Sequence, residues 1–422
     1  MRNIVLFLCC MCMLLSGCGK RNKSTFIVDS NQLHNTDSVD FIEEDYDDPN
    51  MLYLLDFEYM AKNMPPDTFT INSIAKNITL IPLETTRESL LQVFSFQIAK
   101  IDQHYYISSG RVSAGNFAGI MKFDTTGHYI NHLMMKEFGN GPTELPNFLL
   151  NWTSNNHSKV LVASTHIQIL LHTFDDSTTN KYKLTTDAHY ECLLNDGTMV
   201  SLPSPIGYKG SSEIPYMHFR NQESEIIHSF YYPQKRDFTN EIPERDGGGV
   251  VSSYSLHPHY TGDALFKDIF NDTIYRIRSM HDIKPYMILH EGSLAATSKD
   301  ATNATTRDAK LSTNRILDTK KYFFIRYRYR KEYYTSIWDK KTLTLIANTK
   351  IDSKDENEKM LSRSFDSCFF RYIMPNGKKI LLTSKSYYDG ILYAVLDAED
   401  AMEFLPGIVY DDNPILMIID IG

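Results

Sequence analysis

The feature that most constrains the fold is a unit of two short strands joined by a polar turn, which recurs six times after residue 119. The paired segments are Ile120 to Asp124 with Tyr129 to Leu133, Ile167 to Phe174 with Lys181 to Leu184, Tyr216 to Arg220 with Glu225 to Phe230, Thr273 to Ile277 with Ile283 to Leu289, Tyr334 to Asp339 with Leu343 to Ala347, and Ile391 to Leu396 with Ala401 to Leu405. The period is roughly 45 to 60 residues, which is typical of a protein built from repeated sheets.

Further hairpin signals precede most of these units, at Asp102-Gln103, Asn195-Asp196-Gly197 and Asn376-Gly377. Asn-Gly and Asp-Gly pairs provide the positive φ angles of tight hairpins. Four strands per repeat and six repeats predict an all-β fold, a six-bladed β-propeller over residues 67–422. Ile78 to Leu83 and Ile415 to Ile421 are expected to complete one closing blade together. A β-sandwich or a pair of barrels is the alternative.

The N-terminus predicts export and lipidation. Ile4 to Leu15 is an apolar run of 12 residues, too short for a bilayer span of about 20 residues but typical of a signal peptide. The Leu15-Ser16-Gly17-Cys18 tetrad resembles the bacterial lipobox, which implies a leader over residues 1–17 and diacylation of the Cys18 thiol. An ordinary secretory leader with an accidental cysteine is the alternative.

Residues 18–66 are predicted to form a flexible acidic tether. The chain has a net charge of −9, and residues 37–58 contain nine acidic residues and no basic one. Met51 to Met64 has helical spacing and is expected to form a short docked helix that ends at Pro65-Pro66. A nearly neutral body argues against nucleic-acid binding.

Two cysteines, Cys192 and Cys368, remain outside the leader. The repeats place them in different blades, so we expect two buried, inert thiols. A disulfide between them is the alternative in an exported protein.

Four stretches resemble the six-bladed β-propeller lipoproteins of Bacteroidota. They are Ile81 to Thr86, Lys122 to Gly127 with Phe138 to Glu144, Asn271 to Ile277 with Pro285-Tyr286, and Asp412 to Leu416. The resemblance covers residues 78–422 and implies the fold and an outer-membrane location, but no reaction. The basic stretch Gly19 to Lys23 departs from the acidic stretch of surface-exported relatives, which favours the periplasmic face.

No motif for nucleophilic, metal-dependent or phosphate chemistry is present. Gly139 to Glu144 is interpreted as a structural turn, because Pro142 lacks an amide donor. His257-Pro258-His259 is the only tight histidine pair. It could hold a metal if a third ligand joined it, but a loop with two solvated histidines is favoured.

Lys320 to Lys331 is the most unusual stretch, because basic and aromatic residues alternate in it. A strand would place Arg326, Arg328 and Arg330 on one face and Tyr327 and Tyr329 on the other. These five residues are the candidate ligand-binding surface for an anionic glycan. An outer strand with one solvated and one packed face is the simpler interpretation.

These observations favour a non-catalytic propeller that binds a glycan, a peptide or a partner protein in the envelope, with no cofactor. A propeller enzyme of the lactonase or lyase kind, with a metal in the axial channel, is the alternative. The oligomeric state is left open.

Replacing Cys18 with Ala should move the protein from the membrane fraction to the soluble envelope fraction, or leave it uncleaved, because the lipid-bearing thiol is lost. Fractionation with mass analysis of the mature chain measures this. A Cys12→Ala variant, altered within the leader, is the control and should remain anchored. Unchanged mass and membrane retention in Cys18→Ala would contradict lipidation.

Overall fold

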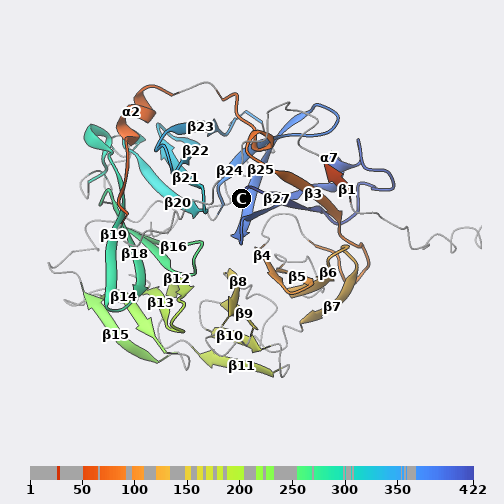
Figure 1. Cartoon of the computed structure of the whole chain (residues 1–422), viewed down its shortest axis with the longest axis horizontal. Coiled ribbons are helices and arrows are strands. Elements are labelled where there is room, and N and C mark those ends of the chain that lie inside the picture. Colours follow the sequence, from red (N-terminus) through yellow and green to blue (C-terminus); the bar gives the residue numbers. More distant parts are fainter. Residues whose placement is uncertain are drawn as a thin grey trace, which may run out of the picture.

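Strands dominate the computed structural model, an all-β propeller whose sheets are arranged around a common axis (Figure 1). The structure describes residues 26–28, 51–64, 67–91, 97–108, 120–133, 148–153, 159–164, 168–173, 178–183, 188–203, 215–221, 225–231, 254–268, 270–297, 300, 306, 308–352, 354–355, 358 and 367–422. The leader, Cys18 and the predicted turn at Gly139 to Glu144 lie outside these residues.

Five of the sheets contain four strands that are consecutive in the sequence, and one of these five gains a further strand from the N-terminal segment. The first two contain β4 (Gln97–Ile101), β5 (His104–Ser108), β6 (Ile120–Asp124) and β7 (Tyr129–Leu133), and then β8 (Phe148–Thr153), β9 (Lys159–Ser164), β10 (Gln168–Thr173) and β11 (Thr178–Lys183). The third contains β12 (Ala188–Leu193), β13 (Met199–Pro203), β14 (Pro215–Arg220) and β15 (Ile226–Tyr231). The last two contain β16 (Tyr254–Pro258), β17 (Ala264–Asp268), β18 (Thr273–Ser279) and β19 (Asp282–Leu289), and then β20 (Ser312–Asp318), β21 (Tyr322–Tyr329), β22 (Glu332–Asp339) and β23 (Leu345–Lys350). The first strand of each sheet lies nearest the axis (Figure 1).

A further sheet joins the two ends of the body. It contains β24 (Phe369–Ile373), β25 (Lys379–Tyr388), β26 (Ile391–Leu396) and β27 (Ile415–Asp420), and β27 pairs antiparallel with β3 (Asn77–Pro82). The predicted joint completion of one sheet by the first and last strands is therefore confirmed. The short strand β1 (Phe26–Val28), from the predicted tether, pairs with the outer side of β3.

Local turn chemistry explains why the hairpins form where the sequence predicts them. Asp102, Gly197 and Gly377 adopt φ angles of 52°, 84° and 85° in three turns that the sequence analysis identified. One predicted strand is wrong: Ala401 to Leu405 is not extended, because helix α7 (Ala398–Ala401) precedes a turn there. Both Ala401 and Leu405 are buried by this arrangement.

The body begins earlier than residue 67. Residues 53–55 form strand β2 (Tyr53–Leu55), which adds to β19 in parallel, and helix α2 (Phe57–Lys62) follows it. Tyr53, Leu55 and Phe57 are at most 1% exposed. The prediction of a tether through residue 66 is therefore corrected, because this segment covers apolar surface of the β16–β19 sheet and the next sheet.

Apolar side chains between neighbouring sheets form the core, as in other stacked β architectures. Cys192 and Cys368 are buried in two different clusters and are not joined in a disulfide, which confirms the predicted burial of both thiols. Within the described parts of the chain, no helix is long and apolar enough to cross a membrane.

Candidate functional site

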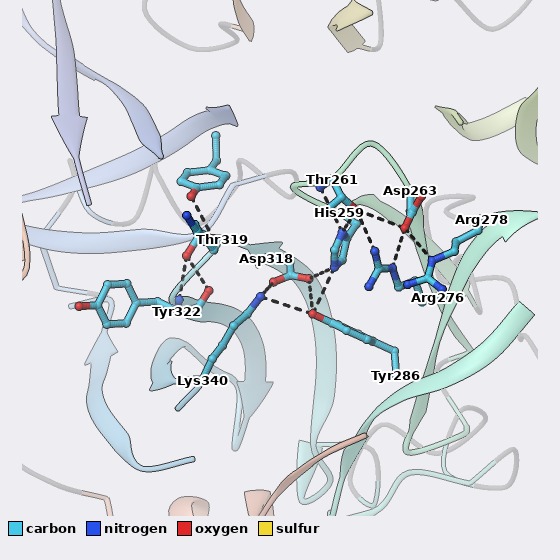
Figure 2. A network of polar contacts seen from close by, with 12 residues as sticks. His259, Thr261, Asp263, Arg276, Arg278, Tyr286, Asp318, Thr319, Tyr322 and Lys340 are labelled. Carbon is cyan, nitrogen blue, oxygen red and sulfur yellow. Dashed lines mark hydrogen bonds and ion pairs between the residues drawn. The ribbon is translucent and has the colours of Figure 1, made fainter. Parts of the chain in front are cut away.

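Charged side chains gather inside the body where the β16–β19 sheet meets the β20–β23 sheet (Figure 2). This buried polar network consists of His259, Thr261, Asp263, Arg276, Arg278, Tyr286, Asp318 and Lys340. The turns after β16 and β22 supply His259 and Lys340, and the last residue of β20 is Asp318. The arginines lie in β18, and Tyr286 lies in β19. Residues from two sheets therefore meet at one junction.

Asp318 is the centre of one half of the network. Its carboxylate forms an ion pair with Lys340, accepts a hydrogen bond of 2.9 Å from Tyr286 Oη, and lies 3.1 Å from His259 Nε2. The side chains of Asp318, Lys340 and His259 are fully buried. Three partners thus surround one carboxylate out of contact with solvent.

Aromatic rings enclose the ammonium group of Lys340. Its Nζ lies 4.4 Å from the ring centre of Tyr260, 4.5 Å from that of Phe323 and 5.9 Å from that of Tyr53. Cations over aromatic faces are stabilised by the ring quadrupole, most strongly when water is excluded. Because Tyr53 belongs to β2, the N-terminal segment helps to close the network.

Burial determines the protonation states in this half. It lowers the pKa of His259 well below 6.5, and the charges of Arg276 and Lys340 lower it further. The imidazole is therefore neutral at pH 7. Thr261 N donates to its Nδ1 at 3.2 Å, so the proton is on Nε2 and is donated to Asp318. Burial also raises the pKa of Asp318, while Lys340 opposes that rise.

Asp263 organises the other half. Its carboxylate accepts hydrogen bonds from Arg276 Nε at 2.6 Å and Arg278 Nε at 3.4 Å, and from Thr261 Oγ1 at 3.2 Å. Arg276 also donates to Thr261 Oγ1 at 2.9 Å. Each formal charge in the network therefore has an opposite charge beside it, which is the condition for tolerating buried ions.

The predicted solvated loop around His257 and His259 is wrong. His257 lies in β16 and His259 directly after it, and the two residues are 1% and 3% exposed. The inner strand is covered by the adjacent sheets, which removes both imidazoles from solvent. Among the described residues, no group of three or more histidine, cysteine, aspartate and glutamate side chains could hold a metal ion.

Strand β21 contains Arg326 and Arg328 but ends before Arg330, and it does not present a solvated arginine face. Tyr327 and Tyr329 are buried in the core. Arg326 is 0% exposed, donates to Ser367 O at 3.1 Å and lies 5.1 Å from the ring of Tyr333. β21 is the second strand of its sheet, and neighbouring sheets cover both of its faces. This is why Arg326 is buried and not solvated as predicted.

Arg328 and Arg330 lie closer to the surface. Arg328 forms an ion pair of 2.7 Å with Asp308. Arg330 is in the turn after β21, with a φ of 52°, and is stacked on the Tyr329 ring at 5.0 Å. The three arginines therefore do not form one exposed surface. Ligand binding by Arg328 and Arg330 stays a prediction.

Sequence reasoning missed Asp318, Lys340 and Tyr286. Lys340 follows Asp339 in a polar turn, which is typical of a solvated lysine, and no local pattern marks its burial. Only the pairing of the two sheets brings these residues together. The histidine pair was the one signal in the sequence that pointed to this region.

Replacing Asp318 with Asn should lower the free energy of unfolding by about 3 to 5 kcal/mol, because Lys340 would keep a buried charge without a counter-ion. Urea denaturation measures the loss. Asp308→Asn, which removes a carboxylate from a more exposed ion pair with Arg328, is the matched control and should cost about 0 to 1 kcal/mol. Adding Lys340→Met to Asp318→Asn should recover stability. Equal losses of stability in the two single variants would contradict a stabilising role for the buried ion pair between Asp318 and Lys340.

Comparison with known proteins agrees with the fold. An exported protein of Bacteroides fragilis has a similar crystal structure, with 15% identity, a TM-score of 0.56, and coverage of 88% of this chain and 99% of that one. A DUF4221 family member from Bacteroides vulgatus has 11% identity, a TM-score of 0.43, and coverage of 82% and 96%. Virginiamycin B lyase from Staphylococcus aureus has 10% identity, a TM-score of 0.41, and coverage of 81% and 98%.

No curated protein sequence matches the chain. One family model does, and its match runs over residues 56–420, from the start of α2 to the end of β27. The chain therefore belongs to the family described as a domain of unknown function, DUF4934.

Proposed function

We propose that the protein is an exported lipoprotein of the cell envelope whose propeller binds a glycan without transforming it. The proposal rests on one observation above all: the ionisable groups gathered at the junction of the two sheets neutralise one another, and all of them except Arg278 are buried from solvent. A general acid or base must reach the atom that it protonates or deprotonates. His259 and Asp318 are fully buried and bonded to each other, so they are suited to holding sheets together.

Several finer features belong to the same proposal. Cys18 carries the lipid anchor, and the body faces the periplasm from the outer membrane. The sheet that contains β3 and β27 counts as a sixth blade beside the five sheets of consecutive strands, a reading supported by its β24–β27 strands. The exported Bacteroides fragilis protein of similar fold supports an envelope location.

Exposed tyrosines give the body surfaces on which sugar rings can stack. Tyr59, Tyr231 and Tyr410 are 67%, 51% and 66% exposed. Large aromatic side chains that remain in contact with water are enriched at binding surfaces. A glycan is therefore the ligand class that we favour.

The test is a retention screen of the full-length protein, purified from membranes in detergent, on immobilised envelope glycans. We expect retention of at least one glycan, with no new product by mass spectrometry and no change on adding a metal chelator. The same glycans passed over a matrix with no protein are the control. Product formation, especially if the chelator abolished it, would favour a metal-dependent enzyme. No retention on any glycan would contradict the proposal.

A further inference from the structure

The inner strands β16 and β20 lie beside each other and bring a second pair of polar side chains together. Arg315 Nη1 lies 3.3 Å from His257 Nδ1, and His257 Nε2 lies 2.9 Å from Ser255 Oγ. His257 is 1% exposed, whereas Arg315 and Ser255 are only partly buried. This pair is separate from the buried polar network around Asp318.

The partners of His257 fix its tautomer. A guanidinium group can only donate, so Nδ1 accepts from Arg315 and the proton must be on Nε2. Burial lowers the pKa of His257 well below 6.5, with a further contribution from Arg315, so the ring is neutral. Nε2–H therefore donates to Ser255 Oγ. An imidazole in this state cannot take a proton from Ser255, which argues against a serine nucleophile and leaves the hydroxyl hydrogen of Ser255 for another acceptor.

Arg315 differs from the cations of the buried polar network. Arg276 and Lys340 each form an ion pair with a carboxylate. Within the part of the chain that the structure describes, no carboxylate lies within ion-pair distance of Arg315, and His257 is its hydrogen-bond partner. Most of the donors of its guanidinium group are therefore available to an acidic ligand.

The two residues before Arg315 add unsatisfied polar atoms. Thr313 Oγ1 and Asn314 Oδ1 are buried and have no hydrogen-bond partner, and Thr313 is only 7% exposed. The pairing of β20 with β21 shifts register between Thr313 and Arg315, so Asn314 is the extra residue of a β-bulge. Bulges occur next to binding and active sites because they redirect side chains. A buried polar atom without a protein partner costs free energy, which a ligand that reaches Asn314 Oδ1 would recover.

We propose that Arg315, with Asn314 and Ser255, binds the carboxylate and hydroxyl groups of an acidic sugar. The guanidinium fork matches a carboxylate with two parallel hydrogen bonds. Ser255 supplies a hydroxyl donor, and Asn314 Oδ1 accepts from a sugar hydroxyl. The inference deepens the proposed glycan-binding function by naming the ligand class and the residues, and it rests on that function.

Isothermal titration calorimetry of the full-length protein in detergent tests this site, with galacturonate and glucuronate beside galactose and glucose. The uronates should bind at least tenfold more tightly than the neutral sugars. Arg315→Gln should weaken uronate binding at least tenfold, and Arg315→Lys should weaken it less because it retains the charge but loses the fork. Arg278→Gln is the matched control, since Arg278 is already paired with Asp263 and Asp282, and it should bind as the wild type does.

Asn314→Asp provides a variant that does not rely on deleting Arg315. It is nearly isosteric and puts a negative charge on the residue next to Arg315 in the bulge, so it should repel a uronate and abolish its binding while the thermal midpoint stays equal or rises. If Arg315→Gln fails to fold, this variant decides the question. Undiminished uronate binding in Asn314→Asp would overturn the proposal, as would equal affinity for uronates and neutral sugars.

The two proposals fail in different ways. If the wild type retains a neutral glycan in the screen but binds no uronate, the acidic-sugar site is wrong and the binding function stands. If it retains no glycan of either kind, both are wrong. If uronate binding is lost equally in Arg315→Gln and Arg278→Gln, the effect is one of general charge, and the site around Arg315 is overturned.

Discussion

The fold depends on the antiparallel pairing of β3 with β27, since the ring of sheets closes only when the first and last strands of the body meet in one sheet. Asn413, directly before β27, reinforces this closure. Its side chain accepts a hydrogen bond from Leu91 N and donates to Glu84 O and Ser89 O, each at 2.8 Å. The next sheet joins the same point, because Glu84 N donates to Gly127 O at 2.8 Å. Gly127 has a φ of 89°, and a Cβ there would lie 2.3 Å from Pro82 O, so a side chain would separate the two sheets.

Closure of the ring forces polar residues of the inner strands into the interior, and the protein deals with them in two ways. At the end of β20, Asp318 is neutralised by Lys340 and hydrogen-bonded by Tyr286. Earlier on the same strand, Arg315 has a neutral histidine as its partner. In the first arrangement the charges are neutralised within the protein, which suits a structural role. The second lacks a counter-ion among the described residues, and we therefore assign it to ligand binding.

The sequence predicts the strands well because the information for them is local. Alternation of apolar residues and turns such as Asn195-Asp196-Gly197 define hairpins without reference to the rest of the chain. The exceptions have physical causes. Residues 53–62 follow an acidic stretch, and only the β19 edge and the neighbouring apolar surface explain why they pack. The burial of Arg326 and His259 depends on the sheets that cover their strands, which strand periodicity does not specify. Arg315 has no sequence signal, since its significance lies in the lack of a carboxylate partner among the described residues.

The body is one closed ring that is joined at β3 and β27 and includes β2. Hydrogen exchange with mass spectrometry can check this closure by comparing peptides that contain residues 53–62, 77–82 and 415–420 with one from β21 and β22. We expect all four peptides to exchange slowly and added urea to accelerate them together, since they open only in global unfolding. Rapid exchange of 53–62, as in a flexible tether, or opening of β3 and β27 well before β21 and β22, would contradict it.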